Sequence, residues 1–461
     1  MKNKSSSKAK KHSKQKVAID QNWQLINPDA AGIDVGSREH WAAIPPSRGG
    51  QTVRCFGATT PELEALGNWL KEAKVSSVAM EATGVYWIAV FQVLERMGFK
   101  VLLVNSRQVK NVSGRKSDVL DCQWIQRLHT YGLLGGSFRP ADPYCVVRSY
   151  LRYRDELVSA RSRQIQHMQK ALLQMNVQLS HVISDISGQS GLAIIGAIVA
   201  GERNPLVLAG KASQRIKSSR DKVARALIGD YRPEHLFVLQ MAYSLYETYQ
   251  TKIAECDQAM IEELNKLPDR VDVQAKPLPP RTEGKKIDQA LRQGLYQKMG
   301  VDLTAIEGIG AKVVLTMLTE VGPDLSAFPS EKHFTSWLGL CPDNRISGGK
   351  VLSSRTRRVV NRFSDALRLA ATSLECSQSA LGAYYRRMKG RLGAAEGVTA
   401  AAHKLARLIY RLIKHGEEYV RLGLEQYEQK NKNRKLRSLQ NIAATLGLQL
   451  VPVQAQTEGV S

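Results

Sequence analysis

The sequence predicts an α/β domain followed by two largely helical regions, and three observations predict this fold class. Residues from about Asp29 to Thr130 alternate between strand-like and helix-like patterns. Val146–Ser180 and Pro233–Leu267 then have the composition of long helices, and the chain is helical again from Asp288. With 461 residues the chain is too long for a single hydrophobic core, so we expect several domains.

The α/β elements follow one another in a recognisable order. Three apolar runs separated by turn residues predict consecutive strands. The next segment predicts a helix because Leu63, Leu66 and Leu70 recur at helical spacing. The expected strands are Ala30–Val35, His40–Ile44, Thr52–Gly57, Ser77–Glu81 and Lys100–Asn105, and the expected helices are Pro61–Lys74, Tyr86–Met97 and Asp118–Tyr131. Three strands followed by alternating helices and strands is the order of an RNase H-like (RuvC-like) fold, which we assign to residues 29–140.

The middle and the ends of the chain differ in composition from this domain. The two long helices predict an antiparallel coiled-coil arm over residues 141–268, with a buried turn region at Gly188–Gly210. Residues 269–287 are rich in proline and form an expected linker, and residues 288–429 form a helical C-terminal domain. Residues 1–28 are expected to be a basic disordered arm, and residues 430–461 a frayed basic tail beginning with Lys430–Arg437.

The charge and the cysteines narrow the class of protein. A net charge of +24 and a pI of about 9.8 indicate a polyanionic partner, most simply nucleic acid. No apolar run is long enough to span a bilayer, so no membrane role is expected. The six cysteines are scattered without a CxxC pair, which argues against a zinc site or disulfide framework and predicts a cytoplasmic protein.

Four acids can be interpreted as one metal site. Asp34 lies at the end of the first predicted strand and Glu81 at the end of the fourth, and these strands are neighbours in an RNase H-like sheet. Asp118 and Asp121 are three residues apart at the start of a helix, so they share a face. Carboxylates are the ligands that Mg²⁺ prefers, and a pair of such ions about 3.5–4 Å apart supports phosphodiester cleavage.

Two blocks of sequence are typical of a known family. The first comprises Gly32–Gly36, Met80–Trp87 and Lys116–Asp121, and the second comprises Ile306–Gly310, Phe328–Ser330, Trp337–Pro342 and Arg345–Lys350. On these blocks the chain resembles the DEDD transposases of insertion-sequence family 110, near its 1111 subgroup. The family's four acids fall on Asp34, Glu81, Asp118 and Asp121, and its serine falls on Ser347. One departure is Cys122, where alanine is usual.

The resemblance implies a RuvC-type domain joined to a serine-bearing helical domain that excises and inserts a mobile element. It also implies that Ser347 attacks DNA to give a phosphoserine link, and that a structured RNA from the element selects target and donor DNA. Because recombination holds two DNA ends together, we expect a homodimer or tetramer.

Basic residues and glycines around the second block are expected to contact nucleic acid. Gly308 and Gly310 belong to a predicted helix-hairpin-helix, in which backbone N–H groups approach a phosphate. The full set is Lys116, Gly308, Gly310, Lys312, Arg345, Lys350, Arg355, Arg357, Arg358 and Arg362. Spacing alone favours an ordinary turn at Ser347–Gly349. A structure-selective RuvC-type nuclease that uses water, and a non-catalytic nucleic-acid-binding module, therefore stay open as alternatives.

Overall fold

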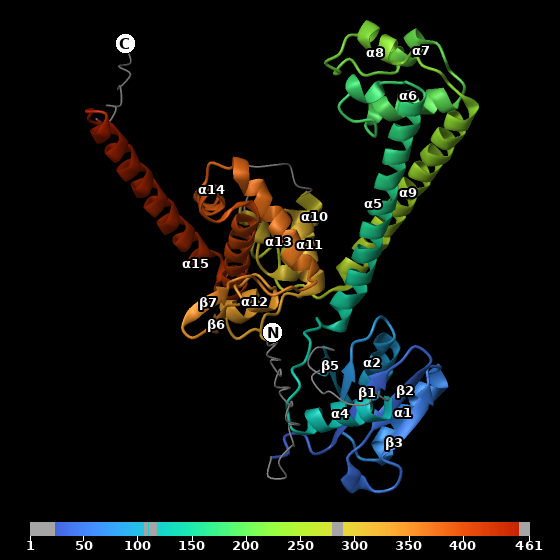
Figure 1. Cartoon of the computed structure of the whole chain (residues 1–461), viewed down its shortest axis with the longest axis vertical. Coiled ribbons are helices and arrows are strands. Elements are labelled where there is room, and N and C mark those ends of the chain that lie inside the picture. The colour runs from blue at the N-terminus through green and yellow to red at the C-terminus, as the bar shows by residue number, and fades with distance from the viewer. Residues whose placement is uncertain (1–23, 106–108, 110–117, 279–288, 451–461) are drawn as a thin grey trace, which may run out of the picture. The chain divides into compact units, whose positions relative to one another are not determined.

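The structure is a computed structural model that describes residues 24–105, 109, 118–278 and 289–450. It divides into two units, with the boundary between Phe138 and Arg139. The first unit contains a central sheet, and the second is mainly helical (Figure 1). Residues 1–23, 106–108, 110–117, 279–288 and 451–461 lie outside the description, and with them most of the predicted basic arm and half of the predicted linker.

A mixed five-stranded sheet forms the centre of the first unit. The strands are β1 (Ala30–Val35), β2 (Glu39–Ala43), β3 (Val53–Gly57), β4 (Ser77–Glu81) and β5 (Lys100–Val104), in the order β3-β2-β1-β4-β5. β1, β2 and β3 pair antiparallel, whereas β1, β4 and β5 run parallel. β1 and β4 are therefore central neighbours, in agreement with the RNase H-like order that the sequence predicts.

Helices cover both faces of this sheet. α1 (Thr60–Glu72) and α2 (Trp87–Arg96) pack on the face formed by Ile33, Val78 and Met80, and the predicted Leu63, Leu66 and Leu70 are all buried there. α4 (Asp118–Thr130) packs on the opposite face, where Ile125 contacts Ala79 and Val104. Alternate residues of each strand therefore face opposite helical layers. A short 3₁₀ helix, η1 (Pro46–Arg48), lies between β2 and β3.

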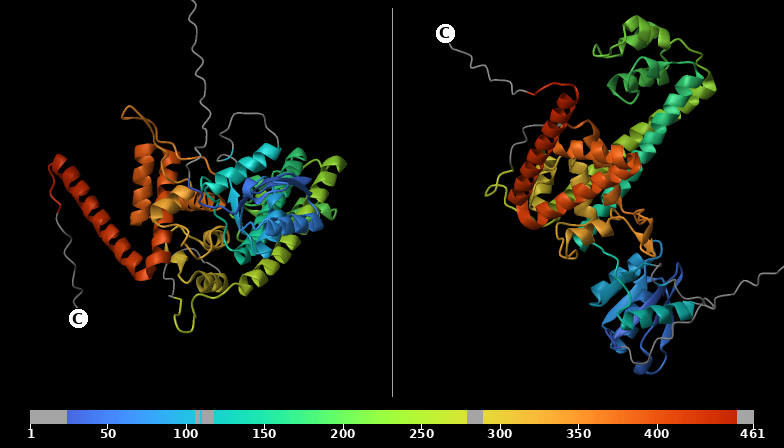
Figure 2. Two further views of the ribbon diagram at one scale, coloured as in Figure 1. Left: turned by 90° about the horizontal axis from the view of Figure 1, so that it is seen from below. Right: turned by 60° about the vertical axis from the view of Figure 1, so that its left-hand side comes forward.

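Two long helices form an arm in the second unit. α5 (Asp142–Gln174) and α9 (Pro233–Lys266) lie side by side in Figure 1 and in the right view of Figure 2. Arg154 pairs with Asp257, and Arg161 donates a hydrogen bond to Gln250, so the helices run antiparallel. The pairing of two long helices is confirmed, whereas the knobs-into-holes packing of a coiled coil stays a prediction.

The end of the arm carries a small helical core of its own. The connection between the long helices contains η2 (Leu179–His181), α6 (Gln189–Val199), α7 (Pro205–Gly210) and α8 (Arg220–Ala226). The expected buried turn region at Gly188–Gly210 is wrong, because α6 and α7 occupy most of it. Ile194, Ile195 and Ile198 recur at helical spacing and are fully buried in this core.

The C-terminal part consists of helices and one β-hairpin. Its elements are α10 (Gln289–Met299), η3 (Leu303–Ala305), α11 (Ala311–Glu320), α12 (Glu331–Trp337), β6 (Arg345–Ser347), β7 (Lys350–Ser353), α13 (Arg362–Thr372), η4 (Ser373–Cys376), α14 (Ala380–Leu392) and α15 (Ala394–Thr445). A 3₁₀ turn, not an α-helix, directly precedes the Gly308–Gly310 segment, so the helix-hairpin-helix stays a prediction. The expected fraying of Lys430–Arg437 is wrong, because α15 continues through it to Thr445. No glycine or proline interrupts the sequence between Gly423 and Gly447, and lysine, arginine, glutamine and leucine favour helix.

Candidate functional site

Two of the predicted acids lie side by side at the ends of the central strands. In the parallel pairing of β1 with β4, Ile33 is the partner of Met80, and Asp34 and Glu81 are the next residues of the two strands. Side chains alternate along a strand, so both acids point to the face opposite Ile33 and Met80. That face is the one covered by α4. The structure therefore places Asp34 and Glu81 on the same side of the sheet as the helix that carries the other two acids.

Gly32 allows α4 to approach β1 closely. A Cβ atom at Gly32 would lie 2.2 Å from the backbone N of Gln126 and 2.5 Å from the carbonyl oxygen of Cys122. Both neighbours are backbone atoms of α4, so no side-chain rotation would relieve the contact. The glycine two residues before Asp34 therefore brings the first turn of α4, with Asp118 and Asp121, to the end of β1. The Gly32–Gly36 motif includes this glycine. The spacing of the motif did not reveal that Gly32 allows α4 to approach β1 closely.

The four carboxylates interact electrostatically. The pKa of Asp34 is raised from 3.8 to about 6, first by burial and then by the negative charges of Asp118, Asp121 and Glu81. Asp34, Glu81 and Asp121 are half-buried, whereas Asp118 is exposed. The charges of all three other acids thus reach Asp34, and the convergence of the four carboxylates on one metal ion stays a prediction.

Asp34 and Asp118 line a solvent-open hollow of about 450 Å³, together with Gly36, Ser37, Arg38, Glu39 and Trp41. Among the described residues, no three acidic, histidine or cysteine side chains are arranged closely enough to hold a metal ion. Arg38 is a cation of this hollow that the sequence analysis missed, since nothing in its spacing distinguishes it from other surface arginines.

Ser347 lies at the end of a short, exposed β-hairpin. β6 and β7 are joined by Gly348 and Gly349, whose φ angles of 54° and 76° are both positive. A two-residue loop of this kind is the turn that favours glycine at both positions. The two glycines are thus explained by turn geometry. The Ser347 side chain and the neighbouring Arg345 and Lys350 are exposed.

Two family models match this chain, one over the region of the carboxylates and one over the region of the Ser347 hairpin. Residues 31–177, which contain β1 to α4 and all of α5, match a family model of IS110-type DEDD transposases, described as a transposase. Residues 302–386, which contain the Ser347 hairpin, match a second model, described as the transposase IS116/IS110/IS902 family. The two matches together cover just over half of the chain. The chain belongs to the IS110 transposase family. No curated protein matches it.

The other predicted contact residues of this IS110-family transposase are spread over the C-terminal part. Arg355 and Arg358 are exposed, and Arg357 donates a hydrogen bond to the carbonyl of Ser336 at 3.2 Å. Gly308 has a φ of 84° and Gly310 is the N-cap of α11. Lys312 and Arg362 both lie beside Asp155 of α5. Lys116 lies outside the described residues.

Two further observations concern the cysteines of the transposase and the apolar content of its helices. All six cysteines are free, and Cys122 lies directly below the carboxylates, where burial first and the charges of Asp34 and Asp121 raise its pKa to about 12. Its thiol stays protonated and donates to the Val119 carbonyl at 3.2 Å. In the described ranges, no helix has the length and apolar content needed to cross a membrane.

Proposed function

We propose that the chain is a metal-dependent DNA recombinase of the DEDD type, and that Asp34, Glu81, Asp118 and Asp121 hold its Mg²⁺. One observation carries this proposal: the charges of Asp118, Asp121 and Glu81 all reach Asp34 on the α4 face of the sheet. A hard divalent cation takes oxygen ligands, so the donor set fits. A cation there would offset the repulsion that raises the pKa of Asp34.

When bound, a pair of such cations activates the attacking oxygen and stabilises the leaving one. The chain supplies the positioning for this chemistry. β1 and β4 fix Asp34 and Glu81 at one level of a rigid sheet, and the contact at Gly32 fixes the first turn of α4 above them. Arg38 lines the same hollow, and a guanidinium can bind a DNA phosphate there through paired hydrogen bonds.

We propose Ser347 as the nucleophile. Its oxygen forms a bond to the phosphorus of one DNA strand and gives up its proton to water, the P–O bond to the neighbouring sugar breaks, and the sugar oxygen that leaves takes up a proton from water. The result is a phosphoserine link. The exposed hairpin, with Arg345 and Lys350 next to Ser347, supports access to DNA and stabilisation of the phosphate charge. A serine hydroxyl is a weak nucleophile until it is activated by a base or a metal.

The resemblance to the 1111 subgroup supports a structured guide RNA and the use of target and donor DNA by the same protein. The net charge of +24 is suited to two polyanionic partners. A dimer or tetramer is supported by the arm, because Phe237, Met241 and Leu245 follow one another at helical spacing on α9 and are all exposed. We infer that this stripe contributes to subunit pairing through coiled-coil contacts.

Strand cleavage of DNA that carries the element's ends tests the proposal. Ser347→Ala should abolish cleavage and leave folding and binding nearly unchanged, because an exposed hydroxyl contributes little to stability. The wild type should form a protein–DNA adduct that survives denaturant. Asp121→Asn should also block cleavage, and excess Mg²⁺ should restore part of it.

The alternatives predict different outcomes. If Ser347→Ala cuts DNA at the wild-type rate while Asp121→Asn does not, the chain is a RuvC-type nuclease that uses water. If neither change affects cleavage, the assignment of both sites is wrong, and Ser353 and Ser354 are the next serines to replace. Failure of the wild type to cut such DNA, with RNA transcribed from the element also present, would leave the non-catalytic binding module as the remaining function.

A further inference from the structure

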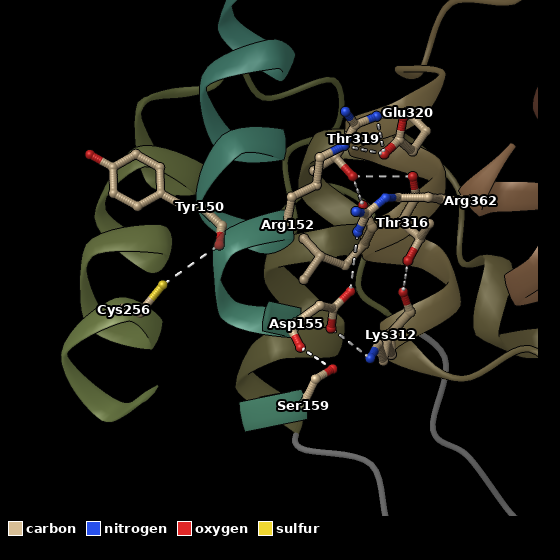
Figure 3. A network of polar contacts seen from close by, with 11 residues as sticks. Tyr150, Arg152, Asp155, Ser159, Cys256, Lys312, Thr316, Thr319, Glu320 and Arg362 are labelled. Carbon is tan, nitrogen blue, oxygen red and sulfur yellow. Dashed lines mark hydrogen bonds and ion pairs between the residues drawn. The ribbon is translucent and has the colours of Figure 1, made fainter. Parts of the chain in front are cut away.

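Asp155 of the arm lies between two cations of the C-terminal helices. Lys312 Nζ donates to Asp155 Oδ1 at 2.9 Å, and Arg362 Nη1 lies 4.0 Å from Asp155 Oδ2 (Figure 3). Lys312 is in the first turn of α11, and Arg362 is the first residue of α13. The Lys312 and Arg362 side chains are 65% and 46% exposed, so both ends of this cluster are open to solvent.

A second ion-pair cluster, next to the first, joins α5 to α11. Glu320 of α11 accepts two hydrogen bonds from Arg152 Nη2, at 2.8 and 2.9 Å, and a third from Arg152 Nε at 3.0 Å. Arg148 approaches Glu320 to 4.0 Å. The Glu320 side chain is 11% exposed, against 33% for Asp155. The half-buried, bidentate Arg152–Glu320 pair has the geometry of a structural contact, whereas the Asp155–Lys312 pair is in the solvated class that contributes little to stability.

We propose that Lys312 and Arg362 form a binding site for a backbone phosphodiester of nucleic acid, and that the Asp155 carboxylate occupies this site in the free protein. The inference rests on the proposed function only in requiring a nucleic-acid partner. A phosphodiester has the same charge as a carboxylate, and its two free oxygens can accept from the lysine ammonium and the arginine guanidinium at once. Binding exchanges two weak, solvated contacts to Asp155 for two contacts to a phosphate and releases counterions from the nucleic acid.

This arrangement makes Asp155 an intramolecular competitor. The affinity for nucleic acid is then lower than the two cations would otherwise give, because each binding event must separate Asp155 from Lys312. Removal of the Asp155 charge should therefore strengthen binding by more than the removal of an ordinary surface acid. Lys312 should account for this gain, because it makes the shorter contact.

Fluorescence anisotropy with a labelled DNA duplex of arbitrary sequence tests the proposal, with the full chain at one fixed salt concentration. Asp155→Asn should bind roughly fivefold more tightly than the wild type, the size expected when one exposed ion pair no longer competes. Glu156→Gln is the matched control, because it removes the same charge from the next residue of α5. Glu156 is exposed and makes no ion pair with a described residue. Its effect should be less than about twofold, which corresponds to general repulsion alone.

A double variant tests whether Lys312 is the cation that is released for nucleic-acid binding when the Asp155 charge is removed. Lys312→Ala in the Asp155→Asn background should return the affinity to that of the wild type or below. The proposal is overturned if Asp155→Asn binds no more tightly than Glu156→Gln, or if the gain survives the loss of Lys312.

A second measurement covers the case in which Asp155→Asn fails to fold. The slope of log K against log salt should be smaller by about one for Lys312→Ala than for the wild type, because one phosphate contact is lost. An unchanged slope would overturn the proposal. Strand cleavage is a separate readout, so a chain that binds as described but does not cut DNA contradicts the proposed function alone.

Discussion

Asp34 is an acid of the candidate metal site whose pKa is raised by folding. Its carboxyl is half-buried and surrounded by three other acids, so its charged form is destabilised in the folded protein. Its folded pKa of about 6 lies above the value of 3.8 for the free side chain. For an acid whose pKa is raised by folding, the stability cost is complete above the folded pKa. It disappears below the unfolded pKa.

Asp34→Asn should therefore raise the melting temperature of the full chain in chelator-treated buffer at pH 8, and have little effect near pH 3, which is below the unfolded pKa of 3.8. The gain at pH 8 should be about 1 kcal/mol, once the shift is reduced for partial solvent exposure. Calorimetry at the two pH values measures this, with the exposed Glu72→Gln as control. A variant that is less stable than the wild type at pH 8 would show that the carboxylates do not repel one another.

The contact between β1 and α4 determines the geometry of the site at the scale of secondary-structure elements. The periodicity of apolar residues is enough to predict these elements and the adjacency of Asp34 and Glu81, because burial imposes the pattern. The sequence does not reveal that Gly32 sets the distance between strand and helix, since this depends on the backbone of residues about 90 positions away. The Ser347 hairpin was also missed as an element. Its apolar residues Ile346, Val351 and Leu352 are exposed, so no burial pattern marks it.

Gly32→Ala tests this contact. The added methyl group must displace α4 from β1, so we expect a loss of roughly 1–3 kcal/mol in stability, typical of overpacking at a tight contact. Divalent-cation binding should weaken as well, because Asp118 and Asp121 move with the helix. Gly294→Ala is the control, since no atom lies within 4 Å of the added Cβ and the position is helical. Wild-type melting and cation binding in Gly32→Ala would disprove the role of this glycine.

The candidate catalytic residues of the whole molecule lie in two different units. The carboxylates lie in the unit that ends at Phe138, and Ser347 lies in the unit that begins at Arg139; each unit contains residues matched by an IS110-family model. The sequence predicts the carboxylate set from spacing, but Ser347 only through resemblance, because a serine before two glycines also fits an ordinary turn. Asp155 and Lys312 are 157 positions apart, so the sequence alone did not pair them.

Divalent-cation binding by the metal-free full chain is the measurement that tests the central claim most directly, since it needs neither guide RNA nor a DNA substrate. Isothermal titration with Mg²⁺, repeated with Mn²⁺, should detect binding to the wild type at pH 8. Asp34→Asn and Asp121→Asn should each weaken it at least tenfold, because each removes a charged oxygen ligand from the same set. The exposed Glu156→Gln should bind as the wild type does. If the wild type binds neither cation, or if Asp34→Asn and Asp121→Asn bind as tightly as the wild type, the four carboxylates are not a metal site.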